Sequence, residues 1–261
     1  MLTLVKLGGS LITDKRVEKS FRRDVVKRLA DEFAGAYMEN PGLKLIIGHG
    51  SGSFGHFAAS RANTINGVHT SDEWKAFALV SNVAAELNGL VVDVLQSAGL
   101  PVWGIQPSAS LLASDGDVSS MSVTSLLTAL ENGLIPVVYG DVSLDLAKGG
   151  TIISTEKLFF YLSSVMSVDR IFLLGEVTGV YDASGTTIDM ITQSNYASLV
   201  AAFRGSAGID VTGGMETKVE DMLSLVTRYP FMTIRIFSGL QEQLLSNALL
   251  DKSYTGTLIA K

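Results

Sequence analysis

Short runs of β-branched and leucine residues alternate along the chain with longer segments whose apolar residues recur at helical spacing. The segment 21–37 shows that spacing clearly, because Leu29 and Phe33 lie one turn apart on the same face. The pattern predicts strands at 2–7, 43–47, 101–105, 134–140, 149–154, 170–175, 233–237 and 256–260, and helices at 21–37, 72–98, 121–131, 155–166, 194–203, 215–227 and 240–249. This alternation predicts crossover connections and a mainly parallel sheet covered by helices on both faces.

No fixed-period repeat, low-complexity tract or obvious linker interrupts the pattern. We therefore expect residues 1–261 to form one domain with a substantial core. A soft boundary near 163–169 separates two sets of strands and helices. It predicts an N-terminal lobe of residues 1–165 and a C-terminal lobe of residues 166–261.

Composition narrows the functional classes. Apolar residues make up 47 % of the chain and charged residues 18 %, which is a globular composition. The net charge of −6 argues against a general affinity for nucleic acid or acidic membranes. The chain has no cysteine, which excludes disulfides, thiolate metal sites and cysteine nucleophiles. Without a signal-peptide pattern or an uninterrupted apolar run near the roughly 20 residues of a membrane helix, we expect a soluble cytoplasmic protein.

Glycine clusters follow three of the predicted strands: GGS at 8–10, GHGSGSFG at 48–55 and GD at 140–141. Open parallel sheets bind ligands beyond the carboxyl ends of their strands, so these loops indicate a common site. A tight turn needs only one or two glycines. The four glycines between 48 and 55 are easier to explain if bare N–H groups closely approach an anion.

Two nucleotide-binding motifs are tested against the glycine loop. Residues 50–55 match G-x-G-x-x-G, but the second strand that should end in an acidic residue about 20 positions on is missing. Asp72 and Glu73 lie near that distance, yet they open a helix, where acidic residues are common caps. The P-loop string G-x-x-x-x-G-K-[ST] does not occur. The sequence therefore favours neither a nicotinamide cofactor nor a P-loop.

Three lysines are candidates for contact with an anion. Lys6 lies one residue before the end of the first predicted strand, where a buried ammonium needs a partner. Lys15 follows in the loop beyond that strand, where a plain surface role is also open. Lys218 falls in the first turn of a predicted helix, where the helix dipole disfavours a cation unless both face a phosphate.

Glycine turns and lysines without an evident catalytic carboxylate beside them suit phosphoryl transfer, which depends on positioning and charge neutralisation. They suit best an acceptor that is already an anion, since it needs no general base. His56 closes the glycine run and can hold and orient an acceptor phosphate. His49 directly follows a strand and is expected to brace the loop, and His69 is given no role.

Four segments in this order, KLGGS (6–10), HGSGSFGH (49–56), PVVYGD (136–141) and DVTGGMETK (210–218), together resemble the amino acid kinase superfamily. The combination of GGSLITDK with GSGSFGH is similar to the isopentenyl phosphate kinases within it. The resemblance runs from residue 4 to about 218. It implies the α/β amino acid kinase fold, a three-layer αβα sandwich with a mainly parallel central sheet.

The resemblance also implies an activity, the ATP-dependent phosphorylation of isopentenyl phosphate to isopentenyl diphosphate by direct in-line transfer. This is a step of isoprenoid biosynthesis by the alternative mevalonate pathway. ATP is the implied co-substrate, with Mg²⁺ accompanying it. The N-terminal lobe would bind the acceptor and the C-terminal lobe the nucleotide. A cytoplasmic homodimer without nucleic-acid or membrane partners is expected.

Positions that match the family's motifs carry its implied roles. The catalytic residues would be Lys6, Lys15, which stabilises charge in the transition state, and His56, which holds the acceptor phosphate. ATP would be bound by Lys6, Gly8, Gly9, Ser10, Gly52, Glu176, Gly179, Val180, Tyr181, Gly213 and Lys218, and the acceptor by Gly50, Ser51, Gly55, His56 and Gly149. No residue is assigned as a metal ligand.

Three departures from the family pattern affect these roles. Ser51 stands where a third consecutive glycine is common, and a small residue still fits there. Residues 155–157 read TEK where Gly-Asp-Asp is common, which leaves any role of the acidic positions open. Residues 175–181 read GEVTGVY in place of T-D-V-D-G-V-Y, so adenosine binding is expected and nucleotide preference is open.

The organic tail of the acceptor needs an apolar wall. Candidates at helical spacing are Trp74, Phe77, Val80 and Val83, although such a stripe is more often plain core. An alternative is a kinase of the same fold that acts on a phosphonate such as fosfomycin, or on another small alkyl monophosphate, because these share the anionic head. A polar tail pocket would favour the phosphonate. A non-catalytic nucleotide sensor is a third alternative, which the presence of all three lysines and His56 disfavours.

Overall fold

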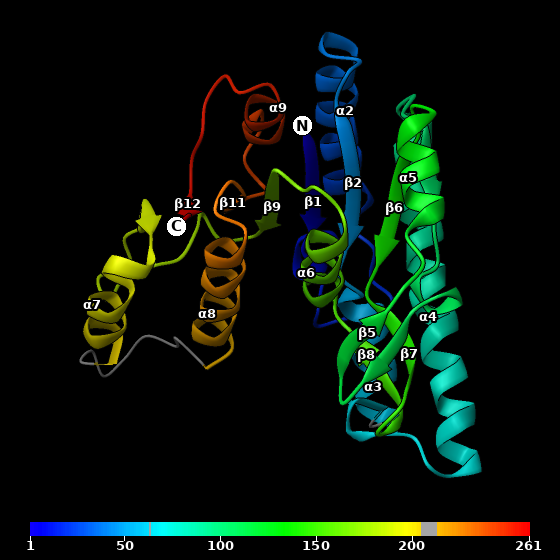
Figure 1. Cartoon of the computed structure of the whole chain (residues 1–261). Coiled ribbons are helices and arrows are strands. Elements are labelled where there is room, and N and C mark those ends of the chain that lie inside the picture. Colours follow the sequence, from blue (N-terminus) through cyan, green and yellow to red (C-terminus); the bar gives the residue numbers. More distant parts are fainter. Residues whose placement is uncertain (63, 205–212) are drawn as a thin grey trace.

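The computed structural model describes residues 1–62, 64–204 and 213–261 (Figure 1). At its centre lies an eight-stranded sheet in the order β10-β12-β11-β9-β1-β2-β6-β3. Its strands are β1 (Leu2–Leu7), β2 (Lys44–His49), β3 (Val102–Gly104), β6 (Ile135–Tyr139), β9 (Arg170–Gly175), β10 (Met190–Ile191), β11 (Thr233–Ser238) and β12 (Thr257–Ile259). Every neighbouring pair is parallel except β11 and β12. The prediction of a mainly parallel sheet is therefore confirmed.

Helices cover both faces of this sheet. They are α1 (Gly9–Ile12), α2 (Arg23–Glu39), α3 (Gly52–Ala62), α4 (Ser71–Ser97), α5 (Thr124–Glu131), α6 (Thr155–Val165), α7 (Gln193–Arg204), α8 (Gly213–Arg228) and α9 (Leu244–Leu249), with short 3₁₀ turns at Thr64–Asn66 and Pro107–Ala109. On one face, α5, α6 and α8 share a core with Leu4 of β1. On the other, α2, α4 and α9 share a core with Val5. Successive strand residues point to opposite faces, so β1 supplies both cores of the αβα sandwich.

A second sheet of four strands, in the order β5-β4-β7-β8, accompanies the first. Its strands are β4 (Leu112–Ser114), β5 (Asp117–Ser120), β7 (Asp141–Asp145) and β8 (Gly149–Ile153). Only β8 is predicted from the sequence, because β4 and β5 are short and because β7 mixes polar with apolar residues. The Asp145 carboxylate accepts hydrogen bonds from main-chain N–H groups of both adjoining turns, which fixes their shape.

Helix α4 shows how a local signal sets an element's start. The Thr70 side chain accepts from the Glu73 N–H, and the Glu73 carboxylate accepts from the Thr70 N–H, which is a capping box. Glu73 is thus a helix cap, in agreement with the rejection of a dinucleotide site. By length and composition alone α4 could cross a membrane. Its residues Leu87, Val91 and Leu95 are nevertheless buried in the core it shares with α2.

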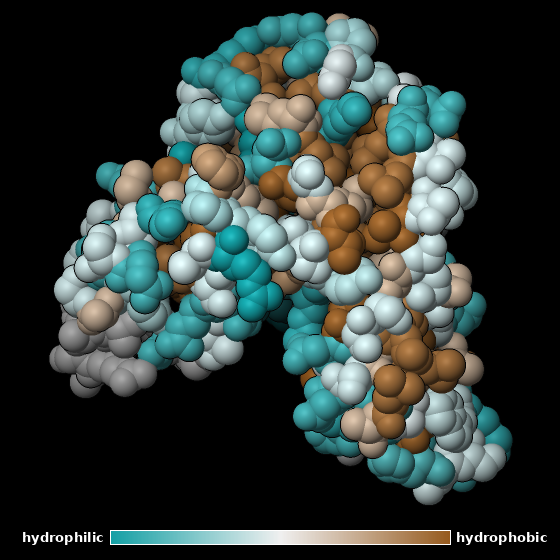
Figure 2. Space-filling model, in the orientation of Figure 1, coloured by the Kyte–Doolittle hydropathy of each residue, from teal (hydrophilic) through white to brown (hydrophobic). Residues whose placement is uncertain are grey.

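The main sheet consists of two halves that join where β1 pairs with β9. Residues before 166 supply β1, β2, β3 and β6, and later residues supply β9 to β12. In the space-filling view the molecule is hollowed between the part that contains α7 and α8 and the part that contains α3 and α4 (Figure 2). The division into functional lobes at residues 165 and 166 stays a prediction.

Candidate active site

The three glycine clusters meet at one edge of the main sheet. They follow β1, β2 and β6, which are neighbours in parallel pairs. The Gly50 N–H donates to the Leu7 carbonyl over 3.0 Å, and the Gly140 N–H donates to the His49 carbonyl over 3.2 Å. The predicted convergence of these segments is therefore confirmed.

The glycines at this edge are first of all required by contacts between main-chain segments. A Cβ on Gly9 would lie 2.8 Å from the Gly52 Cα, and a Cβ on Gly50 would lie 3.0 Å from the Gly9 nitrogen. Gly52 has a φ of +50°, and a Cβ there would lie 2.2 Å from Thr13 Oγ1. A side chain at any of these positions would push the turns after β1 and β2 apart.

The turn after β1 also contacts the C-terminal half. The Gly8 N–H donates to the Leu174 carbonyl over 2.8 Å, and a Cβ on Gly8 would lie 2.8 Å from the same oxygen. Gly9 and Ser10 are the first residues of α1, so their N–H groups have no partner within that helix. The predicted phosphate-contacting segment thus lies between the two halves of the sheet.

The glycine run is predicted as a loop, but from Gly52 onward it forms the first turn of α3. Packing of α3 against α4 and α1 overrides the low helix propensity of glycine here. Residues three and four apart share a helix face, so Gly52, Gly55 and His56 point the same way. The structure therefore places these three predicted residues together.

A pocket of about 520 Å³ opens beside this face. Its polar and glycine lining comes from Gly9, Lys15, Ser51, Gly52, Gly55, His56, Ser60, Gly140 and Asp141. Its apolar lining comes from Ala59, Ile65, Val80, Ala84 and Ile152. Lys15 and His56, which the sequence places in separate motifs, thus face one cavity.

The two histidines of the glycine segment have different surroundings. His56 is exposed on α3, with its ring edge-on to Phe57. His49 is fully buried and stacks on Tyr139, and its two ring nitrogens lie 3.1 Å from the Gly50 oxygen and 3.2 Å from Asn88 Oδ1. Burial lowers the pKa of His49. His49 therefore braces the glycine segment, as predicted, and His56 is free to meet a ligand.

Lys6 and Lys218 come together on a carboxylate that sequence reasoning left open. The Glu156 Oε1 atom forms an ion pair with the Lys6 ammonium and lies 3.6 Å from Lys218 Nζ. Burial lowers the pKa of Lys6. Burial by itself would raise the pKa of Glu156. The charge and hydrogen bond of Lys6 and the charge of Lys218 outweigh it and hold that pKa at about 2. Glu156 is thus an ionised acid between two cations.

Each residue of the unusual TEK segment has a defined contact. Thr155 Oγ1 donates to the His49 carbonyl over 2.6 Å, which ties α6 to the end of β2. Lys157 Nζ lies 2.6 Å from Asp117 Oδ1 and donates to the Gly116 carbonyl, which ties α6 to the small sheet. The departure from Gly-Asp-Asp therefore keeps an acid at position 156 and uses its neighbours to anchor the helix.

The predicted nucleotide segment forms the turn after β9. Gly179 lies against Thr257, where a Cβ would be 2.6 Å from the threonine Oγ1. The Val180 N–H donates to the same oxygen over 2.8 Å. The Tyr181 hydroxyl accepts hydrogen bonds from the side chain and N–H of Thr178, and they lower the Tyr181 pKa. The turn is held by its own hydrogen bonds and by contacts with Thr257 of β12, and its role in binding ATP stays a prediction.

The remaining nucleotide-side positions are Glu176 and two positions on α8, Gly213 and Lys218. Glu176 Oε1 accepts a hydrogen bond from the Arg22 guanidinium over 2.6 Å. Helix α8 begins at Gly213, so Lys218 lies in its second turn and not in the first turn as predicted. The helix dipole is therefore a weaker reason to expect Lys218 at a phosphate. The contact of Lys218 with Glu156 is the stronger reason. Residues 210–212 of the same motif lie outside the described residues.

Two further findings concern the acceptor side. Gly149 has a φ of +74° at the start of β8, and a Cβ there would lie 2.2 Å from the Val68 oxygen. It shapes that turn and does not line the pocket described above. Of the apolar stripe considered for the tail, only Val80 lines the pocket, together with Ala84 one turn later. Trp74 pairs instead with Phe77 near the start of β8.

Asp141 is a pocket residue that sequence reasoning noted only as part of a turn. Its carboxylate is buried and accepts hydrogen bonds from Ser81 Oγ at 3.3 Å and from the N–H groups of Val142 at 2.8 Å and Ser108 at 3.3 Å. Burial raises the pKa of Asp141. These contacts join α4, the segment before β4 and β7, so Asp141 fixes one wall of the pocket.

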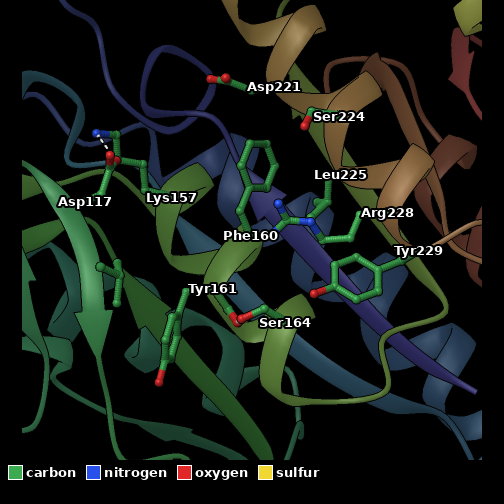
Figure 3. Close-up of a pocket in the computed structure, with 11 residues that line it drawn as sticks. Asp117, Lys157, Phe160, Tyr161, Ser164, Asp221, Ser224, Leu225, Arg228 and Tyr229 are labelled. Atoms are coloured by element: carbon green, nitrogen blue, oxygen red, sulfur yellow. Dashed lines mark hydrogen bonds and ion pairs between the residues drawn. The ribbon is translucent and has the colours of Figure 1, made fainter.

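A second groove, of about 340 Å³, lies between α6 and α8 (Figure 3). Its lining includes Phe160 and Tyr161 from α6 and Leu225 and Arg228 from α8, with Asp117 of β5 near Lys157. None of the predicted site residues lines it. Among the residues that the structure describes, no group of three or more His, Asp or Glu side chains is placed to hold a metal ion.

The family model of the amino acid kinase family matches residues 1–238. The chain therefore belongs to the amino acid kinase family. Within that family it is similar over most of its length to isopentenyl phosphate kinases. The one from Methanocaldococcus jannaschii is 33 % identical over 227 residues, which cover 84 % of this chain and 86 % of the relative. The one from Methanothermobacter thermautotrophicus is 31 % identical, with 99 % and 98 % covered.

A solved structure described as an X-ray structure of isopentenyl phosphate kinase has the same fold. It superposes on this chain with a TM-score of 0.83 at 29 % identity, covering 99 % of this chain and all of the other. The amino acid kinase fold expected from the motifs is therefore confirmed.

Proposed function

We propose that this protein is a kinase that transfers the γ-phosphoryl group of ATP to isopentenyl phosphate and releases isopentenyl diphosphate and ADP. The observation that carries the proposal is the single pocket that Lys15, His56 and the glycine turns share with a set of small apolar side chains. A phosphate head meets donors and cations there, and a short hydrocarbon tail meets an apolar wall. The whole-length similarity to isopentenyl phosphate kinases supports the same substrate.

The acceptor phosphate is ionised at neutral pH, so its oxygen can attack without a general base. We assign its binding to Gly50, Ser51, Gly55 and His56, whose imidazole donates a hydrogen bond and offsets negative charge. Lys15, which lines the same pocket, stabilises the charge that develops on the transferred group. Placement of the two phosphates in line supplies most of the remaining catalysis.

On the donor side, Lys6 and Lys218 neutralise ATP phosphates, and Gly9, Ser10 and Gly52 offer main-chain N–H groups. Gly8, whose own N–H donates to the Leu174 carbonyl, lets the turn that carries them approach the nucleotide closely. Glu156 holds the two ammonium groups beside one carboxylate oxygen. The adenosine lies against residues 176–181 and the start of α8 at Gly213. Cations dominate this edge, so Mg²⁺ enters with the ATP phosphates, which is its usual mode in kinases.

The tail of the acceptor occupies the apolar part of the pocket. Burying each methylene of a hydrocarbon contributes about 0.8 kcal/mol, so a branched five-carbon tail gains useful affinity there. Ala59 and Ala84 leave room for that branch, while Asp141 closes one wall with a polar group. This lining favours a short apolar tail over a long one.

We also propose that the protein is a cytoplasmic homodimer whose copies meet on the side of the molecule formed by α4, α5 and β3. Large apolar side chains are exposed on these elements and next to them, namely Leu79, Trp103, Leu127 and Leu134. Hydrophobic residues gather over this side in the space-filling view (Figure 2). Edge strand β3 lies at its border.

The function is tested by ADP release from ATP and Mg²⁺ with a panel of alkyl monophosphates and alkyl phosphonates. We expect fastest turnover with isopentenyl phosphate and a loss of kcat/KM as the tail becomes polar. Preference for a phosphonate such as fosfomycin would replace the assigned acceptor within the same chemistry. Absence of turnover with every member would overturn the kinase assignment.

A further inference from the structure

Lys15 stands on an exposed loop, residues 14–19, between α1 and α2. The loop closes on itself at its base, where Thr13 and Phe21 form an antiparallel bridge and the Asp14 N–H donates to the Ser20 carbonyl over 3.1 Å. Lysine has a long flexible side chain, so its ammonium is useful only if the main chain below it is held in place.

One residue of α3 holds both ends of this loop. The Ser53 N–H donates to Thr13 Oγ1 over 2.8 Å, and Ser53 Oγ accepts from the Ser20 N–H over 3.1 Å. Thr13 Oγ1 in turn donates to the Gly9 carbonyl over 2.7 Å. Ser53 and Thr13 are fully buried, so the bond between them is shielded from water. The bonds to the Ser20 N–H and the Gly9 carbonyl are partly buried.

Ser53 itself does not line the pocket. It follows Gly52 directly and precedes His56 by less than one helical turn, on the helix that carries the pocket's Gly52, Gly55 and His56. The position of the Lys15 loop relative to this helix is therefore set through Ser53.

The other attachments of the loop region are more exposed. Lys19 pairs with Glu86 over 2.5 Å, and Arg22 pairs with Glu176 over 2.6 Å, with side chains that keep between 29 % and 45 % of their exposure. Exposed ion pairs contribute little to order, typically about 0.2–1 kcal/mol. The contacts of Ser53, one buried and one partly buried, are thus the stronger constraint on the loop.

We infer that Ser53 is a positioning residue for phosphoryl transfer, which acts by holding the Lys15 loop against α3, the helix that carries His56. The inference rests on the proposed role of Lys15. Substitution of Ser53 should leave both substrates bound and lower the rate of the chemical step. A residue needed only for stability would not separate kcat from KM in this way.

The test is a double-mutant cycle of Ser53→Ala and Lys15→Met, with KM and kcat measured for both substrates. Ser53→Ala removes the Oγ acceptor and keeps the main-chain bond to Thr13. We expect kcat to fall about five- to tenfold, the size of one net hydrogen bond, with both KM values within about twofold. In the Lys15→Met background the same change should have no further effect. Additive losses, or a loss carried by KM, would overturn the inference.

Ser20→Ala is the matched control, because Ser20 contacts Ser53 through its main-chain N–H, which the change preserves. Its kcat should stay at the level of the unsubstituted protein. Hydrogen exchange of the amides of residues 14–19 gives a readout that needs no substrate, and Ser53→Ala should accelerate it. Unchanged exchange would contradict the role of Ser53 in holding the loop, even if no acceptor of the panel is turned over. Faster exchange without turnover of any acceptor would instead overturn the assigned function.

Discussion

Lys6 of β1 and Lys218 of α8 meet on the same oxygen of Glu156, although they are more than 200 positions apart in the sequence. Both lysines are candidates for neutralising ATP phosphates, and neither is near the other in the sequence. The acid that joins them comes from the first turn of α6. The placement of the two ammonium groups on the donor side therefore depends on the Glu156 carboxylate.

We predict that Glu156→Gln weakens the use of ATP. Without the acid, two cations face each other at a partly buried place, and burial drives Lys6 further toward its neutral form. The kcat/KM for ATP should fall about tenfold, or ~1.4 kcal/mol of transition-state stabilisation. Initial rates at varied ATP measure it, and Glu156→Asp, which keeps the charge, should recover most of the loss. Equal values for the Gln variant and the unsubstituted protein would contradict the role.

The Glu156 carboxylate should also make the free energy of unfolding depend on pH in the acid range. Its pKa is about 2 in the folded protein against an ordinary value of 4.5. A depressed folded pKa contributes stability that is present above the unfolded pKa and is lost as pH falls toward the folded pKa. Urea unfolding between pH 2.5 and 6 should therefore show a stability difference from Glu156→Gln that shrinks below about pH 4.5. A constant difference across that range would argue against it.

His56→Ala should remove most activity and little stability. The imidazole is exposed, so its loss leaves no cavity, whereas a lost donor to the acceptor phosphate costs about a hundredfold or more in kcat. Initial rates and thermal melting followed by circular dichroism measure the two effects. His69→Ala, a change to another exposed histidine, serves as the control and should retain activity. Near-native turnover of the His56 variant would show that the acceptor is held elsewhere.

Ala84→Leu should obstruct the acceptor and spare the nucleotide. The added side chain enters the apolar part of the pocket, where overfilling costs about 1–3 kcal/mol. The KM for isopentenyl phosphate should rise about tenfold or more while the KM for ATP is unchanged. Gly89→Ala on the same helix, where a Cβ has open space, is the matched control. An equal rise of both KM values would mean that the tail lies somewhere else.

The parallel sheet follows from the alternation of apolar runs and amphipathic helices, since such runs fit only strands buried on both faces. The convergence of the glycine clusters is likewise predictable, because carboxyl ends of adjacent parallel strands share an edge. The small sheet escapes prediction because β4 and β5 are short and polar, and their pairing depends on contacts distant in sequence such as those of Asp145.

Some of the site residues can likewise be predicted from the sequence, and others cannot. Lys6 can be recognised in the sequence because burial of an ammonium in a strand is costly. His56 can be recognised because it ends a run of glycines. Glu156 is an ordinary acid in the first turn of a helix, and only the fold shows that β1 and α8 bring lysines to it. Ser53 gives no signal in the sequence, since buried serines commonly serve local hydrogen bonds.

The main-chain contact between Gly9 and Gly52 has a consequence for the spacing of the two substrates. The turns on which donor and acceptor are proposed to rest touch without any intervening side chain. The shortest distance between these turns is therefore set by the van der Waals radii of main-chain atoms, and no change of side-chain rotamer can alter it.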